Sequence, residues 1–180
     1  MTDTPDRREP LNLAEKLLVL LRLRRDPEGY TPSAKDVTNA TVLPGQRKPA
    51  VSHGQVSSLI AGTSRNPQLS TLATLARALD APTAFLMPGT AWDDLAALTV
   101  YQQSSEARET LRLMQGLEVQ DIVEVCMRLK EIRRRRGLPE DVPAIPPPPP
   151  GVDQPREGRP RRRLSLNEAA ERAADDLEGR

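Results

Sequence analysis

The stretch that decides the fold is residues 52–79, which read SHGQVSSLIAGTSRNPQLSTLATLARAL. Ser52 is suited to cap a helix, because its hydroxyl can accept a free backbone N–H of the first turn. Apolar residues follow at helical spacing, and Gly62 is suited to end the helix. The stretch therefore predicts a short helix, a turn that contains Asn66, and a second amphipathic helix that Pro67 begins.

The two faces of the first predicted helix differ in chemistry. Val56, Leu59 and Ile60 are three and four positions apart, so they form one apolar face that can pack on a core. The other side chains are short and polar, which an ordinary buried helix would seldom show, whereas a helix that reads base edges in a major groove needs them. We therefore expect DNA base contacts from six residues: Ser52, His53, Gly54, Gln55, Ser57 and Ser58.

The pattern of residues 52–79 resembles the Cro/C1-type (Xre) helix-turn-helix family, and Ser33–Val37 resembles the second helix of that family. The matching residues are Val56, Ser57, Leu59, Gly62, Asn66, Pro67, Leu72, Leu75, Ala76, Ala78 and Leu79. The resemblance implies an all-α chain with a five-helix lambda-repressor-like domain that binds double-stranded DNA and regulates transcription.

Residues 11–137 are most similar to the actinobacterial EspR-like regulators. That resemblance implies a long segment between helices two and three and dimerisation through C-terminal helices. The chain also departs from the pattern. Gly54 stands where many family members carry a polar residue, and Ile60 stands where EspR-like proteins carry Arg.

The segment before residue 52 predicts two more helices. Residues 11–25 have apolar positions at helical spacing, and a second helix starts after Thr31 or Ser33 and runs to about Thr41. Residues 42–51 are too long for a compact helix-turn-helix turn. They are either a solvated loop or a basic tip that touches phosphates. We expect phosphate contacts from Ser33, Arg47, Lys48, Thr63, Ser64, Arg65 and Asn66.

Charge is unevenly distributed along the chain. Residues 11–87 carry nine Lys and Arg against five Asp and Glu, although the net charge of the whole chain is only +1. A positive excess on the predicted DNA-binding part is the electrostatic footprint expected of such a domain.

The C-terminal half predicts a helical dimerisation region. Residues 83–87 form a short helix with Phe85 buried, and the DNA-binding domain ends at 87. Helical patterns then continue over 90–137, where we expect Trp92 in the core. The last helix carries an apolar stripe, too rich for three isolated helices, that we assign to dimerisation: Val119, Ile122, Val123, Cys126, Leu129 and Ile132. Taken alone, Cys126 is expected to be a small core residue.

The two ends of the chain lack apolar periodicity. Residues 1–10 are expected to be disordered, and 138–180 a disordered linker and tail rich in Pro and Arg. Residues 165–177 are compatible with a short amphipathic helix. This tail could bind a protein partner.

Several classes of protein are disfavoured by the sequence. One cysteine and one histidine provide no disulfide framework, metal site or catalytic group, so we expect no cofactor and no enzyme activity. No apolar run reaches the length of a membrane span. The sequence predicts a cytoplasmic, nucleoid-associated, homodimeric regulator. The alternative is an adaptor with a degenerate helix-turn-helix that binds a protein through its helical or proline-rich C-terminal part.

Overall fold

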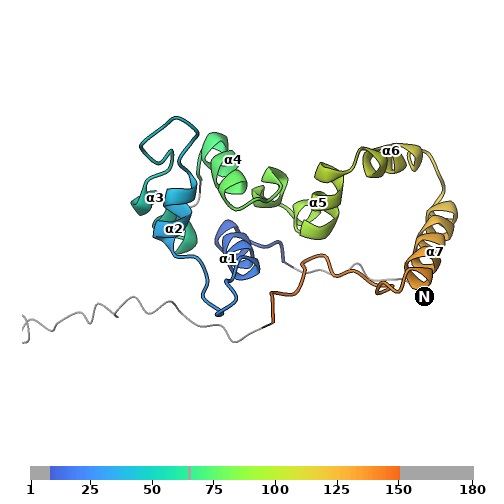
Figure 1. Ribbon diagram of the computed structural model, residues 1–180. Helices are drawn as coiled ribbons and strands as arrows, with labels where there is room; N and C mark the ends of the chain where they lie inside the picture. The colour runs from blue at the N-terminus through green and yellow to red at the C-terminus, as the bar shows by residue number, and fades with distance from the viewer. Residues whose placement is uncertain (1–8, 65, 151–180) are drawn as a thin grey trace, which may run out of the picture.

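The computed structural model describes residues 9–64 and 66–150 of the 180-residue chain (Figure 1). The regular structure within these ranges is helical, which confirms the all-α class. In chain order the α-helices and the one-turn 3₁₀ helices (η) are α1 (Leu13–Leu23), α2 (Ala34–Ala40), α3 (His53–Ile60), α4 (Leu69–Ala78), η1 (Thr83–Leu86), η2 (Thr90–Trp92), α5 (Leu95–Gln103), α6 (Ser105–Leu113) and α7 (Val119–Arg135).

Side-chain caps explain where the first three helices begin. Asn12 accepts the Glu15 N–H at 3.0 Å and donates its own N–H to the Glu15 carboxylate at 2.8 Å, so α1 starts with a reciprocal capping box. The Ser33 hydroxyl caps α2 and the Ser52 hydroxyl caps α3. Each such cap contributes about 1 kcal/mol. The cap predicted at Ser52 is confirmed, and α2 uses Ser33 rather than Thr31.

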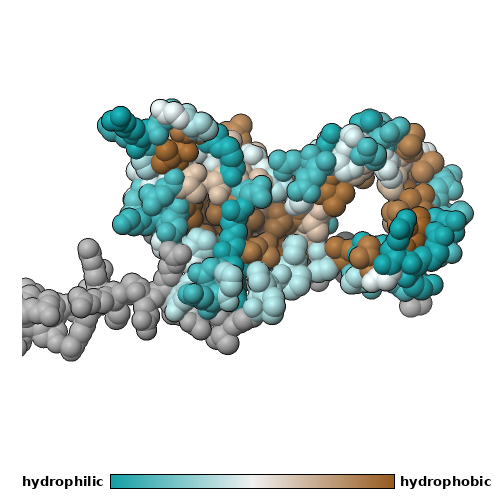
Figure 2. Space-filling view, in the orientation of Figure 1, coloured by the Kyte–Doolittle hydropathy of each residue, from teal (hydrophilic) through white to brown (hydrophobic). Residues whose placement is uncertain are grey.

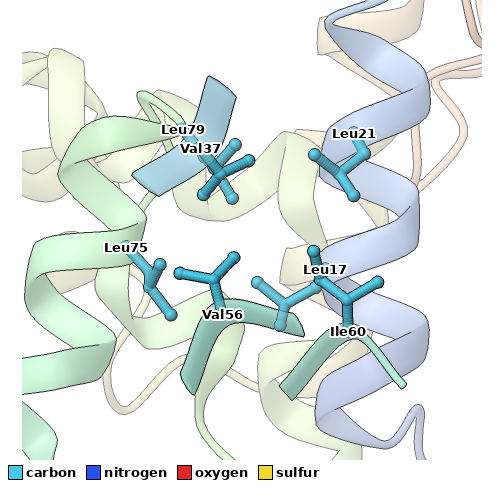
Figure 3. A pocket seen from close by; sticks show the side chains of 7 residues that line it. All are labelled: Leu17, Leu21, Val37, Val56, Ile60, Leu75 and Leu79. Atoms are coloured by element: carbon cyan, nitrogen blue, oxygen red, sulfur yellow. The ribbon is translucent and has the colours of Figure 1, made fainter. Parts of the chain in front are cut away.

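The first four helices and η1 share one apolar core. Helix α1 packs against α3 and η1, α2 packs against α3 and α4, and α4 packs against η1. The side chains drawn in Figure 3 meet at its centre and leave no room for a water molecule: Leu17, Leu21, Val37, Val56, Ile60, Leu75 and Leu79. Burying each large side chain contributes about 1.5–3 kcal/mol, so this core fixes the position of the short helix α3.

The start of α4 differs from the prediction. The helix begins at Leu69, with Gln68 as an extended N-cap, so Pro67 lies before the helix instead of beginning it. Leu69 also follows the helical spacing of the apolar residues in α4, but it is 62% exposed because its position in the first turn faces away from the core. The later stripe residues are buried as expected: Leu72, Leu75, Ala76 and Leu79.

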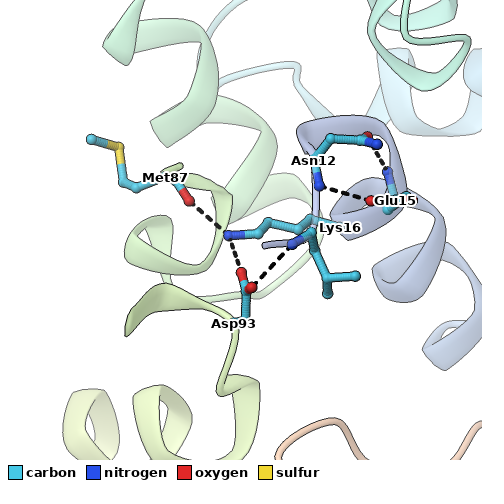
Figure 4. Close-up of polar contacts among 6 residues, drawn as sticks. Asn12, Glu15, Lys16, Met87 and Asp93 are labelled. Carbon is cyan, nitrogen blue, oxygen red and sulfur yellow. Dashed lines mark hydrogen bonds and ion pairs between the residues drawn. The ribbon is translucent and has the colours of Figure 1, made fainter. Parts of the chain in front are cut away.

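The core does not end at residue 87, where we expected the first domain to end. Leu95, the first residue of α5, is 5% exposed and belongs to the same cluster. Lys16 is fully buried, and its Nζ donates to the Met87 carbonyl at 2.7 Å and lies 2.6 Å from Asp93 Oδ1 (Figure 4). These contacts attach η2 and the start of α5 to α1. Trp92, which we expected to be buried, is 41% exposed at the edge of this junction.

Helices α5, α6 and α7 form an arc that leads away from the core (Figure 1). Helix α5 packs against η1 and α6, but no residue of α6 or α7 is buried. Figure 2 shows an open space inside the arc, with apolar side chains along its inner edge. The prediction that Cys126 is a core residue of the single chain is therefore wrong, because α7 has no other element packed over it.

Residues 138–150 return from α7 toward α5 (Figure 1), whereas we expected a disordered linker from 138. Lys130 on α7 pairs with Asp141 at 2.9 Å, and the Ala96 N–H at the start of α5 donates to the Ala144 carbonyl at 2.9 Å. Glu140 likewise pairs with Arg134 at 2.7 Å, so acidic side chains of the returning segment lie against the basic end of α7. The predicted disorder of 1–8 and of 151–180, including the short helix over 165–177, lies outside the described residues.

Candidate nucleic-acid interface

Helix α3 has one buried face and one exposed end. Val56 and Leu59 on its inner face are 1% and 0% exposed, and Val51 just before the helix is 2% exposed. The opposite side of the first turn is open to solvent. It carries four consecutive exposed residues of the predicted base-reading set: Ser52, His53, Gly54 and Gln55. The structure thus brings the N-terminal part of that set together on one surface.

Ser57 and Ser58 are half-buried and lie farther along α3. The Ser58 carbonyl accepts the N–H groups of Thr63 and Ser64 at 3.0 and 3.2 Å, and the Thr63 hydroxyl at 3.0 Å. These bonds satisfy the C-terminal end of α3. Two predicted phosphate-binding residues, Thr63 and Ser64, therefore use their backbone N–H groups within the fold, and Thr63 also uses its hydroxyl proton.

Gln55 is connected to α4. Its Nε2 lies 3.5 Å from the Thr71 hydroxyl oxygen and donates to it. One N–H and the carbonyl oxygen of the Gln55 amide remain for a partner. Thr71 was absent from the predicted site, because the pattern of α4 shows which residues are buried but not which hydroxyl faces α3.

The segment between α2 and α3 is a hairpin whose base is held by hydrogen bonds. Thr41, fully buried, accepts the Val51 N–H on its hydroxyl at 3.3 Å and the Ala50 N–H on its carbonyl at 3.4 Å. Beyond these bonds an isolated antiparallel bridge joins Val42 to Pro49. The long segment that the sequence predicts is therefore present, and its ends are fixed next to the N-terminus of α3.

Arg47 and Lys48 lie near the tip of this hairpin and are exposed. Neither side chain forms an ion pair with an acid in the described part of the chain, so both charges are free to meet an external anion. The hairpin projects from the helical core beside α3 and α4 (Figure 1).

Three residues of the predicted phosphate-binding set remain: Ser33, Asn66 and Arg65. The Ser33 hydroxyl donates to the Asp36 carboxylate at 2.6 Å within the capping box, which leaves it a poor donor for a phosphate. Asn66 is exposed before α4, in agreement with a surface role. Arg65 lies outside the described residues.

The predicted dimerisation stripe lies on the exposed surface of α7. Val119 is 78% exposed, Val123 50%, Leu129 47% and Ile132 39%, while Ile122 is half-buried. Other apolar residues of the arc and the returning segment are also exposed: Val100, Leu111, Leu113, Met127, Leu138 and Val142. Large contiguous apolar surfaces are uncommon on monomeric proteins.

Other kinds of site have no support in the described residues. They contain no group of three or more His, Cys, Asp or Glu side chains that could hold a metal ion. They also contain no helix long and apolar enough to cross a membrane. No protein-family model matches this sequence, and no curated protein matches it significantly.

Proposed function

We propose that the chain is a sequence-specific DNA-binding transcriptional regulator that acts as a homodimer on the bacterial nucleoid, in the cytoplasm. The observation that carries this proposal is the two-sided character of α3. Val56 and Leu59 anchor its inner face, while the outer end presents small and polar groups from Ser52 to Gln55. A rigidly anchored helix with an exposed, polar first turn fits the major groove of DNA.

In the proposed complex, α2 and α3 form the helix-turn-helix pair and α3 is the recognition helix. The Gln55 amide, held at one N–H by Thr71, can still pair with a base edge such as that of adenine. Gly54 adds no side chain, and a Cβ there would meet no atom within 4 Å, so the backbone can approach the DNA closely. Lys48 and the positions around Asn66 contact phosphates and set the register.

The dimer proposal rests on the arc of α5, α6 and α7. A 17-residue helix with no buried residue and a continuous apolar stripe is poorly stabilised in the single chain. Packing the stripe Val119–Ile132 against its copy would bury it and place two α3 helices on one duplex. A two-fold dimer then selects a two-part DNA site with fixed spacing.

The exposed apolar arc also favours a second candidate function. If a different protein covers it, the chain is an adaptor and its first domain need not recognise any base sequence. The two candidates differ in one measurable property, because only the regulator discriminates between duplexes.

The test is fluorescence anisotropy with the full-length protein and a labelled duplex from the region upstream of its own coding sequence. A large excess of random-sequence duplex is present as competitor. The regulator retains binding under these conditions, as specific sites are typically bound 10³–10⁷ times more tightly than random DNA. Equal affinity for both duplexes would contradict the proposal and favour the adaptor.

A further inference from the structure

The hairpin between α2 and α3 is built as a preformed arm. The Gln46 N–H donates to the Leu43 carbonyl at 2.9 Å, and Gly45 between them has a φ of +80°, which closes a tight turn after Pro44. Pro44 and Pro49 restrict the backbone further. Because the bridge and the Thr41 bonds close its base, ordering this arm on a ligand would cost little conformational entropy.

The tip of the hairpin is exposed to solvent and carries polar and cationic side chains. Residues 44–50 are all exposed, and a Cβ built on Gly45 meets no atom within 4 Å. After the turn comes the sequence Gln46-Arg47-Lys48, which offers one amide and two cations. Proteins that bind the minor groove of DNA use Arg, Lys, Asn and Gln to read its A·T-rich pattern and its width. The groove is about 6 Å wide, which admits an extended chain but not a helix.

The position of the arm relative to α3 suits that groove. The chain passes from Arg47 through the buried Val51 directly into Ser52, the N-cap of α3. Five residues span at most about 16–18 Å when extended, and the bends at Arg47, Lys48, Ala50 and Val51 make this segment shorter than that, so the Arg47 side chain supplies the rest of the reach. A minor groove lies about half a helical turn, or roughly 17 Å, from the neighbouring major groove. With α3 in the major groove, it is the Arg47 side chain, and not the backbone of the arm, that has to enter the neighbouring minor groove.

We propose that Gln46 and Arg47 enter the minor groove beside the major groove that α3 occupies, and that they confer a preference for A·T base pairs outside the sequence that α3 reads. This inference rests on the proposed DNA-binding function. Its physical basis is the strongly negative potential of narrow, A·T-rich minor grooves, which attracts an unpaired guanidinium. Amide groups of Gln can also bond to the adenine N3 and thymine O2 acceptors there.

The experiment is selection of binding sites from a pool of random duplexes by the full-length protein, by Arg47→Ala and by Arg112→Ala. Arg112 is an exposed cation on α6, so its removal controls for lost charge. The wild type and Arg112→Ala are expected to enrich a core sequence with A·T pairs about half a turn away. Arg47→Ala is expected to enrich the same core without preference at the A·T positions.

A second measurement separates groove reading from phosphate binding. Inosine·cytosine pairs have the minor groove of A·T pairs, because they lack the guanine 2-amino group, but keep a major groove like that of G·C. Replacing the flanking A·T pairs with G·C should weaken wild-type binding about fivefold to tenfold, and inosine·cytosine should restore it.

The outcomes separate the two proposals. If the wild type enriches no core sequence, the proposed function fails. If it enriches a core but Arg47→Ala selects the same flanks as wild type, or inosine·cytosine binds as weakly as G·C, the arm does not read the minor groove and the further inference is overturned.

Discussion

Lys16 on α1 and Asp93 at the end of η2 form an ion pair in which the lysine is buried and the aspartate is half-buried. Their charged atoms are 2.6 Å apart, in a close contact that lacks the angular geometry of an aligned hydrogen bond. The Asp93 carboxylate also accepts the Leu11 N–H at 3.0 Å. Lys16 Nζ lies 5.5 Å from the centre of the Phe85 ring. The pair therefore joins α1 to the turn between η2 and α5.

Asp93→Ala is expected to destabilise the protein by about 2–4 kcal/mol, because it leaves the Lys16 ammonium buried with only the Met87 carbonyl. The estimate is below the cost typical of fully buried pairs, since the Asp93 side chain is 20% exposed. Glu28→Ala, an exposed carboxylate, is the control and should change stability by less than about 0.5 kcal/mol. Urea unfolding followed by circular dichroism measures both. Equal stability of the two variants would show that the pair is not structural.

The same pair predicts a dependence of stability on acid. Burial alone would raise the pKa of the Asp93 carboxyl, but contacts with Lys16 and the Leu11 N–H, together with the Lys16 charge, lower the pKa below its ordinary value of 3.8. The unfolded chain therefore takes up this proton at a higher pH than the folded protein. The contribution of Asp93 is present above about pH 3.8 and is lost as pH falls through the lower, folded-state pKa.

The measurement for this second prediction is the free energy of unfolding of wild type and Asp93→Asn between pH 3 and pH 7. The difference between them should be constant above about pH 5 and shrink toward pH 3. A difference that stays unchanged down to pH 3 would contradict the assigned pKa shift.

The helices and most of the first core could be predicted because they depend on local patterns. Spacing of apolar residues identified Val56 and Leu59 as inward positions, and both are buried. Capping chemistry identified Ser52. Helical spacing and capping depend only on residues that lie close together in the sequence, so they can be recognised without a structure.

What the sequence could not predict depends on contacts between distant segments. A lysine in an amphipathic helix is usually exposed, and only the approach of Lys16 to Asp93, 77 positions away in the chain, shows that it is buried. Thr71 was missed for the same reason. Trp92 was placed in the core by residue type alone, although its one-turn helix lies at an edge.

Gln55→Ala is expected to reduce affinity for the selected DNA site by about 1–3 kcal/mol and to remove preference at one base pair. Thr71→Val, which keeps the side-chain shape but removes the acceptor of the Gln55 bond, should lose part of that preference. Thr71→Ser should retain it. Binding of the three variants to the selected site and to a scrambled duplex makes the comparison. If Gln55→Ala binds both duplexes as wild type does, α3 is not the reading helix.

Arg65→Ala and Lys48→Ala should behave differently from Gln55→Ala. Cations that neutralise phosphates add affinity for every sequence, so each variant should weaken binding to specific and scrambled duplexes alike. Each should also reduce the slope of log affinity against log salt by about one unit. Titrations over a salt series test this. An unchanged slope with lost sequence preference would assign the residue to base reading instead.

Ile122→Asp combined with Leu129→Asp is expected to produce a monomer, because each change places a carboxylate in the apolar stripe of α7 that a second copy would bury. The first domain should stay folded, as α7 contributes no residue to its core. Glu124→Ala, on another side of the same helix, is the control and should remain a dimer. Light scattering measures the mass of each protein, and anisotropy measures its affinity for a two-part site. A wild-type protein that is monomeric at micromolar concentration would overturn the dimer proposal, and the exposed stripe would then favour a different protein as its partner.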